Sequence, residues 1–203
     1  MNTKEEKSPD ELISLKIMDE ISEDSNLTQR ALSERLGIAL GLVNTYLKHL
    51  IKKGYIRVTQ FPRSRYKYLI TPEGLSEKSR LVYKHLNYYN NFFKTIRNDT
   101  LALFKKMEKE GIKSVIFCGI DEVAEIAYLS LKETNINFLG FFDINLKGKC
   151  LGFPVDDISK VKNTKADAIF LSSVKKKEEL YNKLISLGIE EKKIFYLNGD
   201  SPH

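Results

Sequence analysis

The 203-residue sequence predicts an α/β protein in two parts, a helical N-terminal domain that ends in a basic hairpin and a small C-terminal domain built on a parallel sheet. Three patterns lead to this prediction. Apolar residues recur first at helical spacing around a turn glycine, then at intervals of seven through a long segment, and last in short runs that alternate with helices. We place the N-terminal domain at residues 8–74, a linking and dimerisation helix at 75–110 and the C-terminal domain at 111–198.

Two helices joined by a tight turn form the centre of the N-terminal domain. The first begins after Thr28, a residue type that caps helices, and ends at Gly37, because glycine readily adopts the positive φ of such a turn. The second spans about residues 39–53 and is followed by Gly54, which suits the position after a helix C-terminus. Five apolar residues at helical spacing form its predicted buried stripe: Leu40, Val43, Leu47, Leu50 and Ile51.

A further helix precedes this pair and a hairpin follows it. The preceding helix spans about residues 8–22 and opens with Ser, Pro and Glu at positions that favour a helix start. Two β-rich runs, at 55–60 and 65–70, are joined by a turn at 61–64 that contains proline. This order of elements is that of a winged helix-turn-helix.

The charge of the same region favours a polyanionic partner. Between Arg35 and Pro72 the chain has eight Lys or Arg residues and no Asp or Glu, although 30% of all residues are charged. Lysine and arginine neutralise phosphates and release counterions, while the second helix of such a motif enters the major groove of DNA. The alternative is a small core unit whose basic face is only solvated.

Nine residues are candidates for contacts with double-stranded DNA. The exposed face of the second helix can meet base edges or phosphates, the wing is basic, and the first helix begins with two long polar residues. The candidates are Gly41, Asn44, Thr45 and Lys48 on the second helix, Arg63, Arg65 and Lys67 on the wing, and Gln29 and Arg30 on the first helix.

The sequence of this region also resembles a known family. The segments LTQRALSERLGIALGLVNTYLKHLIKKGYIRV, at 27–58, and YLITPEG, at 68–74, resemble the MarR-like winged-helix regulators associated with exopolysaccharide and capsule gene clusters. The resemblance covers roughly residues 15–81. It implies sequence-specific DNA binding by a homodimer and control of transcription.

The linking helix carries a near-heptad apolar stripe. Its members recur every seven residues, with further apolar residues four positions after two of them. They are Leu75, Val82, Leu86, Tyr89, Phe93, Ile96 and Leu103. Residues 98–100 have the composition of a helix cap, so we expect a break there. The stripe either pairs two chains or packs only on the C-terminal domain; we favour pairing, since one winged domain alone rarely reads enough DNA.

Strands and helices alternate in the C-terminal domain. Because alternation of this kind indicates right-handed crossovers, we expect a parallel sheet of Rossmann type. The predicted strands are residues 113–119, 137–143, 166–172 and 193–197, and the predicted helices are 121–133, 156–161 and 175–187.

The loop after the first of these strands is a degenerate form of a nucleotide-binding loop. A dinucleotide fold places Gly-x-Gly-x-x-Gly there and an acidic residue after the second strand. Here only Gly119 remains of the glycines, and Asp143 ends the second strand. In the functional interpretation Gly119 and Ile120 offer backbone groups to a phosphate and Asp143 meets a ribose. In the other, the domain is a scaffold that binds nothing and only assembles chains.

Residues 103–197 resemble two kinds of Rossmann-like domain. One occurs in sugar acyltransferases and sugar-nucleotide enzymes of polysaccharide pathways, and the other is the NADH-sensing domain of Rex-type repressors. Both have a strand ending in Phe-x-Asp, followed by a loop like residues 147–155. The resemblance implies a nucleotide, sugar nucleotide, coenzyme A or NAD as effector, so a redox-sensing repressor that binds NAD(H) is an alternative function.

Composition narrows the remaining function classes. The two cysteines, Cys118 and Cys150, are expected to be thiols in a reducing cytoplasm, because no signal peptide or membrane-length apolar run is present. No metal-ligand cluster or catalytic arrangement is suggested around the three histidines, so we expect no enzyme. The predicted function is a cytoplasmic, homodimeric DNA-binding regulator. The alternatives are a scaffold whose winged domain binds protein and a catalytic second domain acting on a sugar nucleotide.

Overall fold

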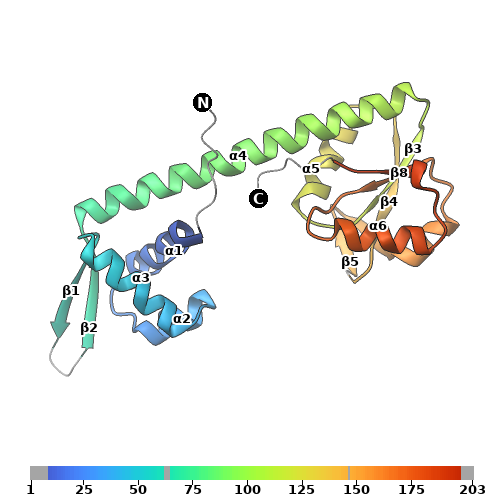
Figure 1. The fold of residues 1–203 in the computed structure, drawn as a ribbon. Helices are drawn as coiled ribbons and strands as arrows, with labels where there is room; N and C mark the ends of the chain where they lie inside the picture. The colour runs from blue at the N-terminus through green and yellow to red at the C-terminus, as the bar shows by residue number, and fades with distance from the viewer. Residues whose placement is uncertain (1–8, 62–64, 146, 198–203) are drawn as a thin grey trace. The chain divides into compact units, whose positions relative to one another are not determined.

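The computed structural model describes residues 9–61, 65–145 and 147–197. It confirms a mixed α/β chain with a winged helix in its N-terminal half and a sheet of mostly parallel strands in its C-terminal half (Figure 1). The chain divides into two compact units between Asn90 and Asn91.

The N-terminal unit has the predicted order of elements. Its elements are α1 (Pro9–Glu23), α2 (Gln29–Leu36), α3 (Leu40–Lys52), β1 (Ile56–Phe61) and β2 (Arg65–Ile70). Thr28 caps α2 by accepting a hydrogen bond at 3.1 Å from the Ala31 N–H, and Gly37 follows the helix with a φ of 64°. Gly54, after α3, has a φ of 77°, as its position predicts. The turn expected at 61–64 lies mostly outside the described residues.

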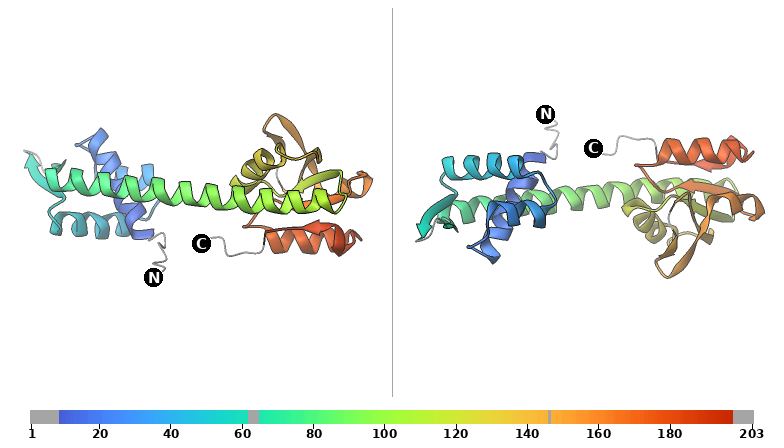
Figure 2. Two further views of the ribbon diagram at one scale, coloured as in Figure 1. Left: turned by 90° about the horizontal axis from the view of Figure 1, so that it is seen from above. Right: turned by 90° about the horizontal axis from the view of Figure 1, so that it is seen from below.

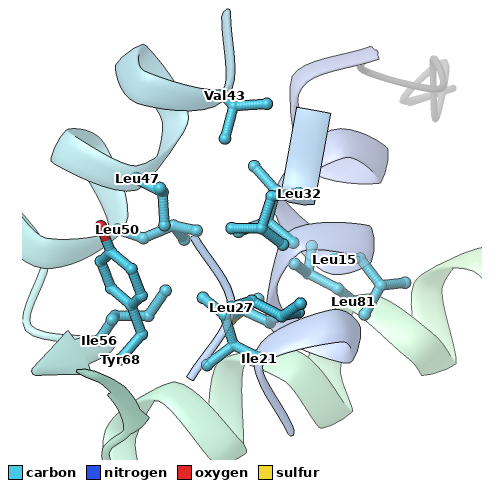
Figure 3. Close-up of a cluster of buried hydrophobic side chains, with 12 residues drawn as sticks. Leu15, Ile21, Leu27, Leu32, Val43, Leu47, Leu50, Ile56, Tyr68 and Leu81 are labelled. Carbon is cyan, nitrogen blue, oxygen red and sulfur yellow. The ribbon is translucent and has the colours of Figure 1, made fainter. Parts of the chain in front are cut away.

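The core of this unit joins all three helices, the hairpin and the next helix. Figure 3 shows side chains from these elements converging on one cluster. The cluster contains Leu15, Ile17, Met18, Ile21, Leu27, Leu32, Val43, Leu47, Leu50, Ile56, Tyr68 and Leu81. The predicted stripe of α3 is narrower than expected, because Leu40 and Ile51 are exposed. Both lie to one side of the line through Val43, Leu47 and Leu50, which are the buried residues of this helix.

The next helix begins against the base of the wing. Helix α4 spans Pro72–Lys109, and its first turn is capped by Thr71, whose Oγ1 accepts from the Gly74 N–H at 3.0 Å. The backbone at Gly74 lies so close to the wing that a Cβ there would be 2.0 Å from the Tyr55 carbonyl oxygen. Only glycine fits this approach.

The break expected at residues 98–100 is absent, because α4 is a single helix through this stretch. Thr100 is buried, and its hydroxyl lies 2.6 Å from the Ile96 carbonyl and 2.8 Å from the Ser130 hydroxyl. A threonine that bonds its own preceding turn satisfies its polar group without ending the helix. The cap-like composition therefore reflects a buried polar contact with α5.

The C-terminal unit is a six-stranded sheet in the order β5-β6-β4-β3-β7-β8. Its strands are β3 (Ser114–Cys118), β4 (Asn137–Asp143), β5 (Gly148–Cys150), β6 (Phe153–Asp157), β7 (Ala168–Leu171) and β8 (Ile194–Phe195). Its further helices are α5 (Glu122–Leu131), α6 (Lys177–Ser186) and the 3-10 helices η1 (Ile158–Asn163) and η2 (Glu191–Lys193). All pairings are parallel except that of β5 with β6.

The hairpin β5–β6 was not predicted and corrects the interpretation of residues 147–155 as a loop. Its two-residue turn has Leu151 at a φ of 49° and Gly152 at 84°, the combination of positive φ values that tight hairpins use. Strand β6 then pairs with the end of β4 and extends the sheet beyond the predicted four strands.

Helices cover both faces of this sheet. Alternate residues of β3 point to opposite faces, where Phe117 packs with α4 and α5, and Cys118 packs with η1 and α6. Figure 2 shows α5 and α6 on opposite sides of the strands. The second domain is thus a three-layer α/β/α sandwich whose strands carry residues that are buried on both faces.

Replacement of Gly74 tests the contact between α4 and the wing. We expect Gly74→Ala to lower the free energy of unfolding of the N-terminal unit by about 2 kcal/mol or more, since its Cβ would overlap backbone that cannot move easily. Urea unfolding followed by circular dichroism measures the change. Gly41→Ala is the matched control: no atom lies within 4 Å of its added Cβ, so it should cause no loss. Equal stability of the two variants would contradict the close approach.

Candidate nucleic-acid interface and the crevice of the second sheet

The exposed face of α3 holds three of the predicted DNA-contacting residues. Gly41, Thr45 and Lys48 are spaced by four and three residues, which places them on one side of the helix, and all three are exposed. The buried residues Val43 and Leu47 lie on the other side. The face turned away from the core is therefore small, polar and basic, as a groove-binding helix requires.

The N-terminus of α3 is open. Ala39, at the N-cap position, makes no side-chain cap hydrogen bond, and Gly41 has free space where a Cβ would stand. Backbone N–H groups at a helix start, together with the helix dipole, favour a phosphate. The first turn of α3 can approach a DNA backbone closely for this reason.

Asn44 is less available than predicted. The residue is half-buried, and its Oδ1 is covered without a hydrogen-bond partner among the described residues. A buried amide oxygen without a hydrogen-bond donor destabilises the fold. A rotation of the Asn44 side chain toward a donor would therefore lower the free energy. Thr45 is better placed, because its hydroxyl donates to the Gly41 carbonyl at 3.0 Å and keeps its acceptor capacity exposed.

The wing places basic residues on both of its strands. Arg57 of β1 is exposed and Lys67 of β2 is half-buried. Arg65 is the first residue of β2, where it pairs with Phe61, and Arg63 lies outside the described residues. Sequence reasoning did not select Arg57 because it is distant from the predicted tip, although its position in the acid-free stretch could have marked it.

The two candidates on α2 differ. Arg30 is exposed, and its ion pair with Glu34 at 3.5 Å is weak because both side chains are mostly in solvent. Gln29 is half-buried and donates from Nε2 to the Tyr68 hydroxyl at 3.0 Å. Gln29 therefore ties α2 to β2, and its predicted role at a phosphate would require this bond to break.

A cavity of about 420 Å³ lies between α1, α3 and the first turns of α4. Two basic residues of α4 form ion pairs beside it: Arg80 contacts Glu77 at 2.8 Å and Glu11 at 3.5 Å, and Lys84 contacts Glu11 at 2.6 Å. The Lys84 ammonium lowers the pKa of Glu11, and the Arg80 guanidinium lowers the pKa of Glu77. The contacts of Arg80 and Lys84 with Glu11 hold α4 to α1 beside the recognition helix. Sequence patterns did not mark the cavity, because its lining comes from three separated segments.

In the second domain, Asp143 is buried and its carboxylate is already bonded. It accepts from the backbone N–H of Ile120 at 3.1 Å and of Asn145 at 3.0 Å, and it lies 3.1 Å from the Lys176 Nζ. The structure places Asp143 beside Ile120, the two residues that the sequence assigned to one site, and adds Lys176 from the loop after β7, which the sequence pattern did not mark. The N–H that was predicted to face a phosphate is donated to Asp143.

The space beside Gly119 is filled by protein. Its φ is 92°, and a Cβ there would lie 2.5 Å from a Leu180 methyl carbon and 2.7 Å from the Ser173 Cβ. At the same edge of the sheet, Asp121 follows β3 and accepts from the N–H of Val174, which follows β7, at 3.0 Å. The glycine thus permits close packing between the ends of β3 and β7, where a dinucleotide fold leaves room for the pyrophosphate. These residues do not fit a bound dinucleotide.

The surroundings of Cys118 are those of an unreactive thiol. Cys118 is fully buried, and burial raises its thiol pKa, which opposes the thiolate that a redox sensor needs. Within residues 9–61, 65–145 and 147–197, no three His, Cys, Asp or Glu side chains cluster as a metal site would require. None of the helices in those ranges is long and apolar enough to cross a membrane.

Comparison with family models gives two partial matches. Residues 10–57 match the winged helix-turn-helix DNA-binding model, and residues 111–195 match the model described as C2185-like, N-terminal. Comparison with curated protein sequences gives no match. The first match and the geometry of α3 agree that the N-terminal unit is a winged helix-turn-helix DNA-binding domain.

Comparison with solved structures gives likenesses at low identity. The PcaV transcriptional regulator from Streptomyces coelicolor is 20% identical, over 52% of this chain and 74% of that chain, with a TM-score of 0.39. A MarR protein from Peptoclostridium difficile is 16% identical over 63% and 75%, with a score of 0.37. RSP, a Rex-family repressor, is 18% identical over 94% and 81%, with a score of 0.34. Scores this low support no conclusion about function.

The pKa shifts predict an acid-sensitive N-terminal unit. The pKa of Glu11 is lower in the folded chain than its ordinary 4.5. Its contribution to stability is therefore present above the unfolded value and lost as the pH falls through the folded one. We expect Glu11→Gln to flatten the loss of stability below about pH 4.5, measured as the melting temperature at several pH values. Glu34→Gln, at an exposed ion pair, is the control and should leave the profile unchanged. A profile that Glu11→Gln does not alter would rule out this coupling.

The filled crevice predicts that nucleotides do not stabilise the protein. We expect no change in melting temperature with NADH, NAD, coenzyme A or UDP- and GDP-sugars, because a ligand raises it only by binding the folded state. Asp143→Ala should lower it, since Lys176 and two N–H groups would lose their acceptor. A rise with one nucleotide class that disappears in Asp143→Ala would restore the ligand-sensing interpretation.

Proposed function

We propose that this chain regulates transcription by binding specific sites in double-stranded DNA through α3 and the β1–β2 wing. The observation that carries the proposal is the open, basic face of α3 on a winged helix-turn-helix domain. From Arg35 to Pro72 the chain has no acidic residue, so nothing in this stretch would repel the phosphates. A protein-binding scaffold would not need this one-sided charge.

In this proposal α3 enters the major groove with its N-terminal half. Gly41 lets the backbone approach, Thr45 meets a base edge or a phosphate, and Lys48 contacts a phosphate or a guanine. Asn44 reads a base only after its side chain turns outward. Its uncompensated oxygen favours that movement, because a base amino group would supply the missing donor.

The wing and α2 would contact the DNA backbone on either side. Arg57 and Lys67 are the wing residues for this role whose burial the structure describes, Arg65 at the start of β2 is a further candidate, and Arg63 is added by sequence. Arg30 is placed to reach a phosphate because its ion pair with Glu34 is mostly in solvent. Such contacts set orientation and affinity and carry no sequence information.

For the second domain we propose a role in assembly or partner binding. This is supported by the polar groups at the ends of β3 and β7, which are already hydrogen-bonded within the domain. Control of polysaccharide or capsule genes is proposed on the resemblance of residues 15–81 alone. The filled space beside Gly119 makes the NAD(H)-binding alternative less favourable.

The first experiment is to let the purified protein select its site from random-sequence duplexes, then to measure binding by fluorescence anisotropy at several salt concentrations. We expect Lys48→Ala to weaken binding about tenfold and to reduce the slope of log K against log salt by about 1. Lys106→Ala, an equal charge change on the second unit, is the control and should alter neither value. Failure to select any sequence, with equal loss in both variants, would reject a specific DNA-binding function.

A further inference from the structure

The first turn of α3 exposes two large apolar side chains, Leu40 and Leu42. Their exposed fractions are 43% and 39%. Gly41 lies between them, and no atom stands within 4 Å of the position that a Cβ would take there. A single exposed leucine needs no explanation in a globular domain. Two leucines that flank a glycine at the start of a recognition helix indicate a surface that a partner covers.

Each leucine lies one helical turn before a residue that can read a base. Leu40 precedes Asn44 by four residues and Leu42 precedes Thr45 by three, and residues at these spacings are neighbours on a helix surface. Recognition helices present their N-terminal residues to the base edges of the major groove. The two leucines are therefore placed to reach the groove beside the side chains that would form hydrogen bonds there.

The charge around the leucines decides which partner they fit. Lys48 and Lys52 of α3 and Arg57 of the wing are exposed, and no acidic residue occurs between Arg35 and Pro72. A partner of this surface must therefore supply negative charge around an apolar spot. DNA does so, because phosphates flank the major groove and the C5-methyl of thymine is an apolar group on the base edges within it.

Asn44 gives a second, independent indication. Its Oδ1 is covered and has no hydrogen-bond partner among the described residues, so a ligand that donates a hydrogen bond would satisfy it. In an A·T pair the adenine N6 amino group is a donor and the thymine carries a methyl group. A G·C pair offers the cytosine N4 donor without a methyl group. The A·T pair alone supplies both a donor for Asn44 and an apolar contact for a leucine.

We propose that Leu40 and Leu42 read thymine C5-methyl groups, so that the DNA site of this protein has A·T pairs opposite the first turn of α3. This inference rests on the proposed function, since it requires α3 to lie in the major groove. It makes the two leucines specificity-determining residues, whereas Lys48 and the wing set affinity. An apolar contact releases no counterions, so it adds sequence preference without adding salt dependence.

The test starts from the DNA site that the full chain selects from random-sequence duplexes. Each thymine of that site is replaced in turn by deoxyuridine, which pairs in the same way and lacks only the C5-methyl. We expect a loss of affinity of about threefold to tenfold at one or two positions of the site, the effect of burying one methyl group. Where such a pair is exchanged for C·G, 5-methylcytosine should bind more tightly than cytosine by a similar factor.

Alanine variants assign the effect to the leucines. Leu40→Ala and Leu42→Ala should each reduce the difference between thymine and uracil, and the double variant should abolish it. The slope of log K against log salt should stay unchanged, because no charge is removed. Ile51→Ala is the matched control: this residue is also exposed, at 37%, but lies at the other end of α3 and should keep the full difference. Circular dichroism checks that all variants keep the wild-type helix content.

Several outcomes would overturn the inference. If a selected site binds equally well with thymine and uracil at every position, no methyl group is read. If the double variant keeps the difference, another residue reads it. A changed salt slope in the leucine variants would show that they lose phosphate contacts instead. In these three cases DNA binding itself stands, whereas failure to select any sequence rejects the proposed function and this inference together.

Discussion

The N-terminal unit depends on the contact between Gly74 and the Tyr55 backbone. The Tyr55 carbonyl accepts from the Thr71 N–H at 3.1 Å, and the Tyr55 N–H donates to the Leu50 carbonyl at 2.9 Å. Thr71 Oγ1 donates to the Gly54 carbonyl at 2.6 Å. The end of α3, both ends of the wing and the start of α4 therefore meet at one backbone junction. The recognition helix, the wing and the first turn of α4 are therefore held in one arrangement within this unit.

In the second domain, side-chain packing and a buried ion pair stabilise the ends of the central strands. Where a nucleotide-binding sheet leaves an open crevice, this chain fills it with Ser173, Leu180 and the pair formed by Asp143 and Lys176. A buried carboxylate is stable only when it is paired and hydrogen-bonded, and here two N–H groups and one ammonium supply that. The residues that resemble a ribose site are explained by packing and charge compensation within the domain.

Most elements could be predicted from the sequence because their signals are local. Thr28, Gly37 and Gly54 act within one or two turns of themselves, so their roles in capping and turning are confirmed by the structure. Strand β4 was predicted at its observed bounds. The hairpin β5–β6 was missed, because the three-residue strand β5 has no periodicity of its own and pairs only with β6, which in turn lies beside β4.

The failures at the candidate sites have a common physical cause. Whether Thr100 ends a helix, whether Gln29 faces solvent and whether Asp143 is free all depend on partners more than 25 residues away. A side chain's chemistry can be read from its type, but its availability is decided by tertiary contacts. The exposed face of α3 was easier to predict, because a residue opposite a buried stripe needs no partner to be exposed.

The pairing of two chains that the stripe of the linking helix predicts would be thermodynamically linked to the proposed DNA binding. If a symmetric DNA site engages both winged domains, it strengthens the pairing of the chains by the same factor by which pairing strengthens binding to that site. The apolar stripe predicted for pairing begins at Leu75, in the first turn of α4, where this helix meets the end of α3 and the wing. A change that alters pairing would therefore change DNA affinity without touching any residue of α3. Such a chain needs no ligand in the winged domain to be regulated, only a partner or condition that shifts the monomer–dimer balance.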